Sequence, residues 1–247
     1  MRFKRHQYII IICLVSFLFI CCFKSWRVQE QLYHAYYYIT LPDKPITNKA
    51  ELTELLSSFK RIEYKDLKAD YKNYTKSELP GYKELLDSKS YYTIKRKDFY
   101  KRIAGSFRIK DLIAKDKFYK SCIKNGSEEY MWLISEELLL KLFDLRMALE
   151  EAGNDPNAFS ITNAHRHPKY NEDVGGASKS RHIQGQALDL YIGDINKSGS
   201  YEKEDKQIVL DLLEDQIIGD HGGIGRYPDT RAVHFDVRGH RARWDRY

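Results

Sequence analysis

Cysteine is nearly absent from the part of the chain that can form a soluble domain. Three of the four cysteines lie in an apolar run near the N-terminus, and Cys122 is the remaining one. A single thiol cannot form a disulfide within the domain. The same lack of cysteine excludes a cysteine-rich zinc cluster. Motifs for RNA or DNA binding are lacking as well, so we expect no nucleic-acid partner. The net charge of +6 suits a polyanionic wall polymer or an anionic membrane surface.

The longest apolar run, residues 8–23, follows several basic residues at the very start of the chain. This order is typical of a signal peptide or signal anchor, which we place at residues 1–27. The run has 16 residues, fewer than the roughly 20 of a full membrane span, and a buried core helix is the alternative. The positive charges before it predict that the domain lies outside the cytoplasmic membrane, in the periplasm or cell envelope, with that membrane as a partner.

The remaining chain divides by composition into two parts. Charged residues at 31% and hydrophobic residues at 43% argue against global disorder. Residues 28–125 form a Lys- and Tyr-rich extension without a cluster of metal ligands, and residues 126–247 form the candidate functional domain. Within the extension, the tyrosines and prolines of 28–46 indicate an extended connection, and the apolar spacing over 47–59 indicates a helix.

The pattern of residues 126–247 predicts an α+β fold in which an antiparallel sheet carries the site and helices pack against it. The predicted strands are 130–134, 159–162, 222–226 and 231–237, and the predicted helices are 135–151 and 201–218. His234 and Asp236 are two residues apart on a predicted strand, so they share a face.

Three residues of this domain form a candidate zinc site. His182 and Asp189 lie seven residues apart across a glycine, and His234 follows in an apolar strand. Two histidines and one carboxylate leave the fourth position of zinc open to water, as in catalytic sites. Zinc held there would lower the pKa of its bound water to roughly 7 and polarise a carbonyl group. The alternative is that these are ordinary polar residues in loops.

The segment 159–244 resembles the zinc D-alanyl-D-alanine carboxypeptidase and murein endopeptidase family, whose fold is shared with the hedgehog signalling domain. Four blocks occur in the family's order: TNAHRHPKYN (162–171), VGGA (174–177) with SRHIQGQALD (180–189), GGIGRYP (222–228) and VHFDVRG (233–239). The resemblance implies a zinc peptidase acting on peptidoglycan peptides. It also implies that Arg166 grips a substrate carboxylate, and Ser180 either contacts the substrate or supports the site. His165 and His167 form a competing metal pair, although neither is a ligand in the family.

The sequence departs from the family at the general base. Carboxypeptidases of the family often carry an acidic residue three positions before the last histidine, where this chain has Arg231. Proton transfer to the leaving amine still needs a base. The candidates are Asp236, which matches the V-H-x-D block of related endopeptidases, Asp229 and His221.

A second metal signal lies after Asp189. The segment 194–205 offers oxygen ligands at loop positions one, three, five and twelve with glycine at position six, which resembles a calcium loop. The ligand positions are Asp194, Asn196, Ser198 and Asp205. A plain polar turn is the alternative.

Taken together, these features predict a zinc metallopeptidase that hydrolyses stem peptides or cross-links of peptidoglycan during cell wall remodelling. The sequence leaves open whether it is a carboxypeptidase or an endopeptidase. The competing hypothesis is a membrane-tethered, zinc-containing module that binds wall peptide or a protein without cleaving it.

Overall fold

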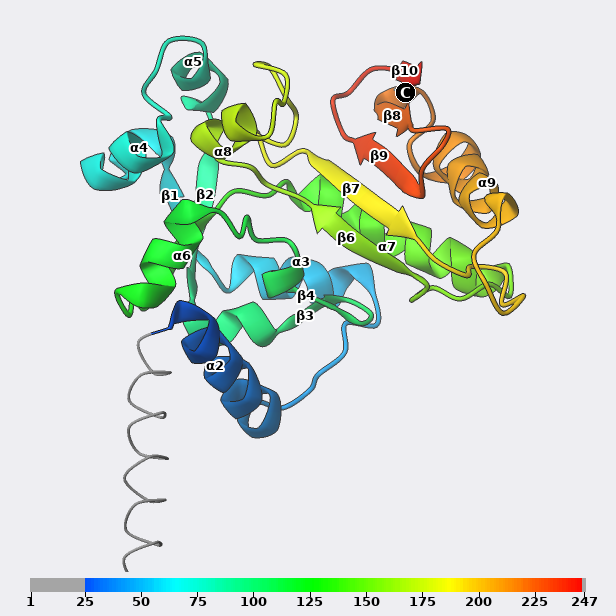
Figure 1. The fold of residues 1–247 in the computed structure, drawn as a ribbon, viewed down its shortest axis with the longest axis horizontal. Coiled ribbons are helices and arrows are strands. Elements are labelled where there is room, and N and C mark those ends of the chain that lie inside the picture. Colours follow the sequence, from blue (N-terminus) through cyan, green and yellow to red (C-terminus); the bar gives the residue numbers. More distant parts are fainter. Residues whose placement is uncertain (1–24, 246–247) are drawn as a thin grey trace, which may run out of the picture.

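The computed structural model describes residues 25–245 (Figure 1). The predicted targeting run 8–23 lies outside these described residues. Within them, no helix combines the length and apolar character that crossing a membrane requires.

Helices and short strands alternate along the chain. The helices are α2 (Trp26–Thr40), α3 (Lys49–Ser57), α4 (Ala69–Thr75), α5 (Tyr82–Leu86), α6 (Lys117–Lys124), α7 (Glu136–Glu151), α8 (Pro168–Asp173) and α9 (Lys203–Leu212). The strands are β1 (Lys60–Glu63), β2 (Ser90–Lys95), β3 (Arg102–Ala104), β4 (Phe107–Arg108), β5 (Glu129–Trp132), β6 (Phe159–Asn163), β7 (Ala187–Ile192), β8 (Gly223–Arg226), β9 (Ala232–Asp236) and β10 (Ala242–Asp245).

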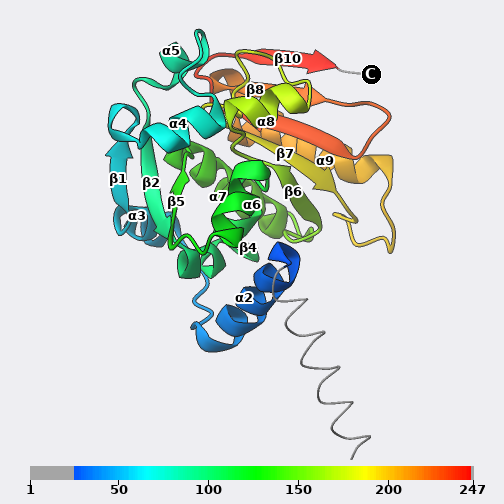
Figure 2. The same cartoon turned by 60° about the vertical axis from the view of Figure 1, so that its left-hand side comes forward.

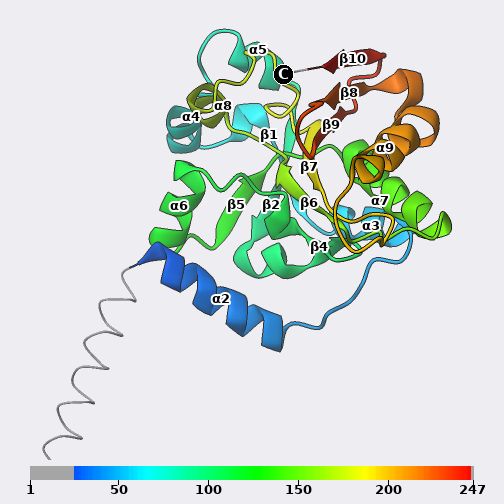
Figure 3. The same ribbon diagram turned by 45° about the vertical axis from the view of Figure 1, so that its right-hand side comes forward.

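A five-stranded sheet in the order β10-β8-β9-β7-β6 forms the centre of the C-terminal part. Its neighbours are antiparallel except β10 and β8, which are parallel. Helix α7 runs along this sheet behind β6 and β7, and α9 lies beside α7 (Figures 1 and 3). The predicted α+β architecture with an antiparallel sheet is therefore confirmed.

The sequence of α7 explains its position. Leu138, Leu142, Leu145 and Leu149 recur every three or four residues, and all four are fully buried. Glu136 and Glu137 in the first turn suit the positive end of the helix. The apolar stripe thus fixes which face of the helix meets the sheet.

A second sheet of three strands, in the order β1-β2-β5, stands beside the first (Figure 2). One hydrophobic cluster contains side chains from both parts of the chain, including Leu56 of α3, Trp132 of β5 and Phe235 of β9. The core therefore continues across residue 125, and the boundary expected there stays a prediction.

Two sequence-based expectations need correction. The segment 28–46 is not extended, because α2 occupies most of it and Pro42 follows the helix end, where proline is common. Tertiary contacts hold α2: Arg96 lies 3.5 Å over the ring of Tyr33, and Tyr119 donates to Glu30 at 2.7 Å. The predicted helix 201–218 is α9 followed by one π-helical turn, Leu213–Ile217.

A buried contact between a histidine and an aspartate joins α6 to the loop that follows β6. His167 Nδ1 lies 2.6 Å from Asp116 Oδ2, and the other Asp116 oxygen accepts from the Tyr119 amide as the cap of α6. Burial opposes ionisation of Asp116, but the bond to His167 and the helix amides outweigh it and lower its pKa.

Because the folded state lowers the pKa of Asp116, we expect its contribution to stability to be complete above about pH 4 and to disappear as the pH falls further. At pH 6 to 7, Asp116→Asn should lower the free energy of unfolding by about 1–3 kcal/mol, and the difference should shrink below pH 4. Urea unfolding at several pH values measures this. The exposed Asp87→Asn serves as the control, and a difference that grows towards acid pH would contradict the assignment.

Candidate metal centre

The sheet register brings the three predicted metal ligands together. Asp189 of β7 lies directly opposite His234 of β9, and His182 approaches from the turn before β7. One possible ligand atom from each residue lies within 4.8 Å of the other two. Among the described residues this is the one group of three or more histidine, cysteine or acidic side chains so arranged.

Gly185 holds the His182 turn against the neighbouring chain. Its φ is +66°, and a Cβ there would lie 2.6 Å from the Leu133 carbonyl oxygen. The Gly185 carbonyl accepts from the Ser135 amide at 2.8 Å, just before α7. Glycine is therefore required in the spacing between His182 and Asp189, because any side chain would push the turn away from the core.

In each imidazole one nitrogen is held by an oxygen acceptor of the protein, and the other faces Asp189. His182 Nδ1 lies 2.6 Å from the Ala164 carbonyl, which can only accept, so Nε2 carries the lone pair and faces Asp189 Oδ1 at 3.1 Å. His234 Nε2 lies 3.1 Å from Asp236 Oδ2, and its Nδ1 lies 2.8 Å from Asp189 Oδ1. This matches the way metal-binding histidines are oriented in proteins.

The charges at the centre are strongly coupled. Burial lowers the pKa of His182, whereas for His234 the carboxylates of Asp189 and Asp236 outweigh burial and raise its pKa. Burial also disfavours the Asp189 carboxylate, but the two histidines overcome this effect and hold its pKa well below the usual range. Asp189 is therefore an anion at neutral pH, as a metal ligand must be.

Asp236 is fully buried behind His234. Arg238 donates to both of its oxygens, from Nε at 2.8 Å and from Nη2 at 2.5 Å, and the Gly223 amide donates at 3.2 Å. Burial opposes its ionisation, but Arg238 and His234 hold its pKa low. Asp236 thus positions His234 and has no free route to a substrate.

The centre opens into a pocket of about 660 Å³. Arg166 donates to Asp189 Oδ2 at 2.6 Å, and Ser180 Oγ accepts from the His182 amide at 3.3 Å. The charged residues of the lining are Arg166, Lys179, Arg181, Arg238 and Asp189. Among the described residues Asp189 is the one carboxylate of this lining, so the pocket favours an anionic ligand.

Comparison with known families agrees with this geometry. The family model described as Peptidase M15 matches residues 107–236, just over half of the chain. The chain belongs to the Peptidase M15 family. This membership supports a metallopeptidase. A search of curated proteins and a search of solved structures each find no match.

Two candidate bases of the M15 domain lie outside the pocket. Asp229 is exposed in the turn between β8 and β9, where its charge acts on Lys206 of α9. His221 is exposed in the short turn before β8, and its carbonyl accepts from the Gly239 amide. Neither residue lines the metal pocket.

His165 and His167 are both buried, and their rings lie 4.9 Å apart in an edge-to-face arrangement. His167 is paired with Asp116, and among residues 25–245 the two histidines belong to no group of three side chains able to hold a metal. Arg166, between them, turns to Asp189 instead. The pair therefore packs in the interior, apart from the metal group.

The loop 194–205 closes through hydrogen bonds of its own. Asp194 accepts from the amides of Ser198 and Gly199, at 2.9 and 2.8 Å. Asp205 is fully buried and accepts from the amides of Asn196 and Glu202, the latter at the start of α9. Because its carboxylate caps a helix, this geometry fits the polar-turn alternative, and calcium binding stays a prediction without support here.

Sequence reasoning missed Arg238, Lys179, Arg181 and Trp244 as residues of the site. Arg238 follows Asp236 by two positions, and this spacing is a signal that could have indicated their pairing. The ring of Trp244 of β10 lies beside His234 with ring centres 5.1 Å apart and the ring planes tilted by 56°, and the pairing of β10 with β8 places it there.

Asp236→Asn should weaken metal binding about 10- to 100-fold, since it removes the charge that orients His234 and balances Arg238. Competition with a chromophoric chelator measures the affinity, and circular dichroism checks that the variant is folded. Asp229→Asn, an aspartate outside the pocket, should bind metal like the wild type. Unchanged affinity of folded Asp236→Asn would show that Asp236 does not position the ligand.

Proposed function

We propose that the protein is a zinc-dependent peptidase that hydrolyses peptide bonds in stem peptides or cross-links of peptidoglycan. The observation that carries this proposal is the orientation of the two histidines, each of which turns one ring nitrogen to Asp189 and the other to an oxygen acceptor of the protein. Two neutral imidazoles and one carboxylate form a three-ligand set suited to catalytic zinc. The fit of zinc to this site rests on the chemistry of the three ligand groups and on the positions of the ring nitrogens.

In this proposal His182, Asp189 and His234 hold zinc, which when bound supplies Lewis acidity and an activated water at neutral pH. Asp236 keeps the proton on His234 Nε2, so that Nδ1 stays free as a ligand. Arg166 lies next to Asp189 at the pocket wall, where its planar guanidinium can orient a substrate carboxylate. Lys179 and Arg181 add positive charge for the same anionic group.

One observation favours the alternative, a zinc-containing module that binds without cleaving. No second carboxylate lines the described part of the pocket, and Asp236 is occupied by Arg238. A hydrolase needs a group that takes a proton and returns it to the leaving amine. The two functions differ in product formation and not in metal binding.

We further propose that residues 8–23 tether or export the protein, with the domain outside the cytoplasmic membrane. Basic residues before the run and the peptidoglycan substrate both support this location. The mild positive net charge is compatible with an anionic wall polymer.

Digestion of purified peptidoglycan by the full-length protein, read by mass spectrometry, tests the function. We expect peptide products that disappear with a chelator and with His182→Ala, a loss of at least about 1,000-fold in rate, because two remaining ligands cannot keep zinc in a catalytic geometry. Asp229→Asn should retain activity. Stoichiometric zinc without products from any stem or cross-linked substrate would favour the binding module.

A further inference from the structure

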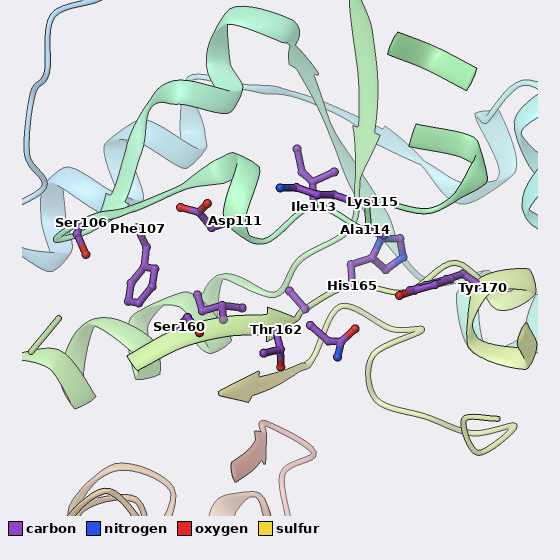
Figure 4. A pocket seen from close by; sticks show the side chains of 13 residues that line it. Ser106, Phe107, Asp111, Ile113, Ala114, Lys115, Ser160, Thr162, His165 and Tyr170 are labelled. Carbon is purple, nitrogen blue, oxygen red and sulfur yellow. The ribbon is translucent and has the colours of Figure 1, made fainter. Parts of the chain in front are cut away.

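A groove of about 430 Å³ adjoins the metal pocket and is not used by the metal site (Figure 4). Strand β6 and the residues that follow it form one wall, and the segment 106–115 forms the other. Asn163 and Tyr170 line both this groove and the metal pocket, so the two cavities meet at these residues.

One side of β6 has no strand partner. In the five-stranded sheet β6 is the end strand, and β7 is its one strand neighbour among the described residues. Gly193 donates to the Ala158 carbonyl, and the register continues with Ser160 opposite Tyr191 and Ile161 opposite Leu190. Since antiparallel pairs alternate, Ile161 directs its N–H and C=O away from β7, towards the free edge.

In the described chain, the opposite wall of the groove provides no hydrogen-bond partner for the free edge of β6. The amide of Ile109 donates to the carbonyl of Lys101, and the amide of Leu112 donates to the carbonyl of Ile109. Neither bond reaches β6. The carboxylate of Asp111 accepts from the Arg108 amide at 2.9 Å. No hydrogen bond between residues 106–115 and β6 occurs in the described chain.

His165 lines the inner end of the groove with an unused polar atom. The residue is 2% exposed, and its Nδ1 is buried without a hydrogen-bond partner. Figure 4 shows its ring beyond the end of β6, and Ala114 and Tyr170 line the same groove. A buried polar nitrogen without a partner costs stability, so it points to a ligand that supplies one.

The groove leads directly to the metal ligands. Ala164 follows β6 and lines the groove, and its carbonyl lies 2.6 Å from His182 Nδ1. In the adjoining metal pocket, Arg166, Lys179 and Arg181 line the wall and attract a carboxylate. A peptide whose carboxyl end reaches these cations has its N-terminal portion over the groove.

We infer that the substrate lies as an extended strand along the free edge of β6, parallel to it, with its N-terminal side in the groove and its carboxyl side in the cationic pocket. The strand makes main-chain hydrogen bonds to the edge, as in other peptides that extend a sheet. This inference rests on the proposed peptidase function and narrows its substrate to a peptide chain with about three residues before the scissile bond. Ser160 to Asn163 spans at most roughly 10 Å at about 3.3 Å per residue, and the register shifts between Ile161 and Asn163.

Binding of synthetic peptides tests the inference without relying on turnover. Peptides of stem composition with a free C-terminal carboxylate are titrated calorimetrically into the full-length protein, both zinc-loaded and chelated. Each of the first three residues added on the N-terminal side should tighten binding, and alternate residues should gain most, by about 2- to 10-fold for each pairing residue. Further N-terminal residues and amino acids added after the carboxyl end should bring no gain.

Backbone methylation separates strand pairing from side-chain contact. Methylating the amide nitrogen of alternate residues should weaken binding about 2- to 10-fold, and methylating the intervening ones should not. In the protein, Ile161→Pro removes the outward N–H, which an edge strand tolerates, and should abolish most of the gain with length. Ile161→Ala is the matched control for loss of the side chain, and should keep that gain.

The outcomes distinguish the two proposals. Length-dependent binding without hydrolysis of any peptide would support the groove and contradict the peptidase. Hydrolysis with equal affinity and rate for short, long and methylated peptides would overturn the groove and leave the peptidase standing. If Ile161→Pro does not fold, the methylated peptides decide the question alone.

Discussion

The pairing of β7 with β9 is the constraint on which the site depends. It sets Asp189 opposite His234 and, two residues along the same strand, buries Asp236 behind the imidazole. A shift of β9 by one residue would turn His234 and Asp236 to the other face of the sheet, away from Asp189. The hydrophobic residues between them, Leu188, Leu190 and Phe235, are fully buried and so hold this register against the core.

Gly185 and Arg238 complete the support of the metal centre. Gly185 allows the His182 turn to lie against Leu133, so that the Ala164 carbonyl can fix the ring. The Arg238 side chain neutralises Asp236, which would otherwise be a buried charge with only His234 and two backbone amides to oppose it. The chain's own contacts therefore hold the three candidate ligands in place, which is what a binding or catalytic constellation requires.

The sequence was sufficient for the features that depend on short spacings. These features are the helical period of α7, the alternation of β9 and the spacing between His182 and Asp189. Each concerns residues that are close together in the sequence, and the structure brings these ligands together. The sequence was not sufficient for features that depend on contacts between segments far apart in the chain. Helix α2 is held by Arg96 and Tyr119, and Trp244 reaches His234 through β10. Asp229 is exposed in the turn between β8 and β9, whereas Asp236 is buried at the end of β9.

The most direct test of the metal centre is X-ray absorption spectroscopy on the zinc-loaded, full-length protein. The structure predicts two imidazole nitrogens at about 2.0–2.1 Å, one carboxylate oxygen and one exchangeable oxygen from solvent, with no sulfur. His182→Ala should lose one imidazole from this shell. A shell of four protein ligands, or a sulfur ligand, would contradict an open site made by His182, Asp189 and His234.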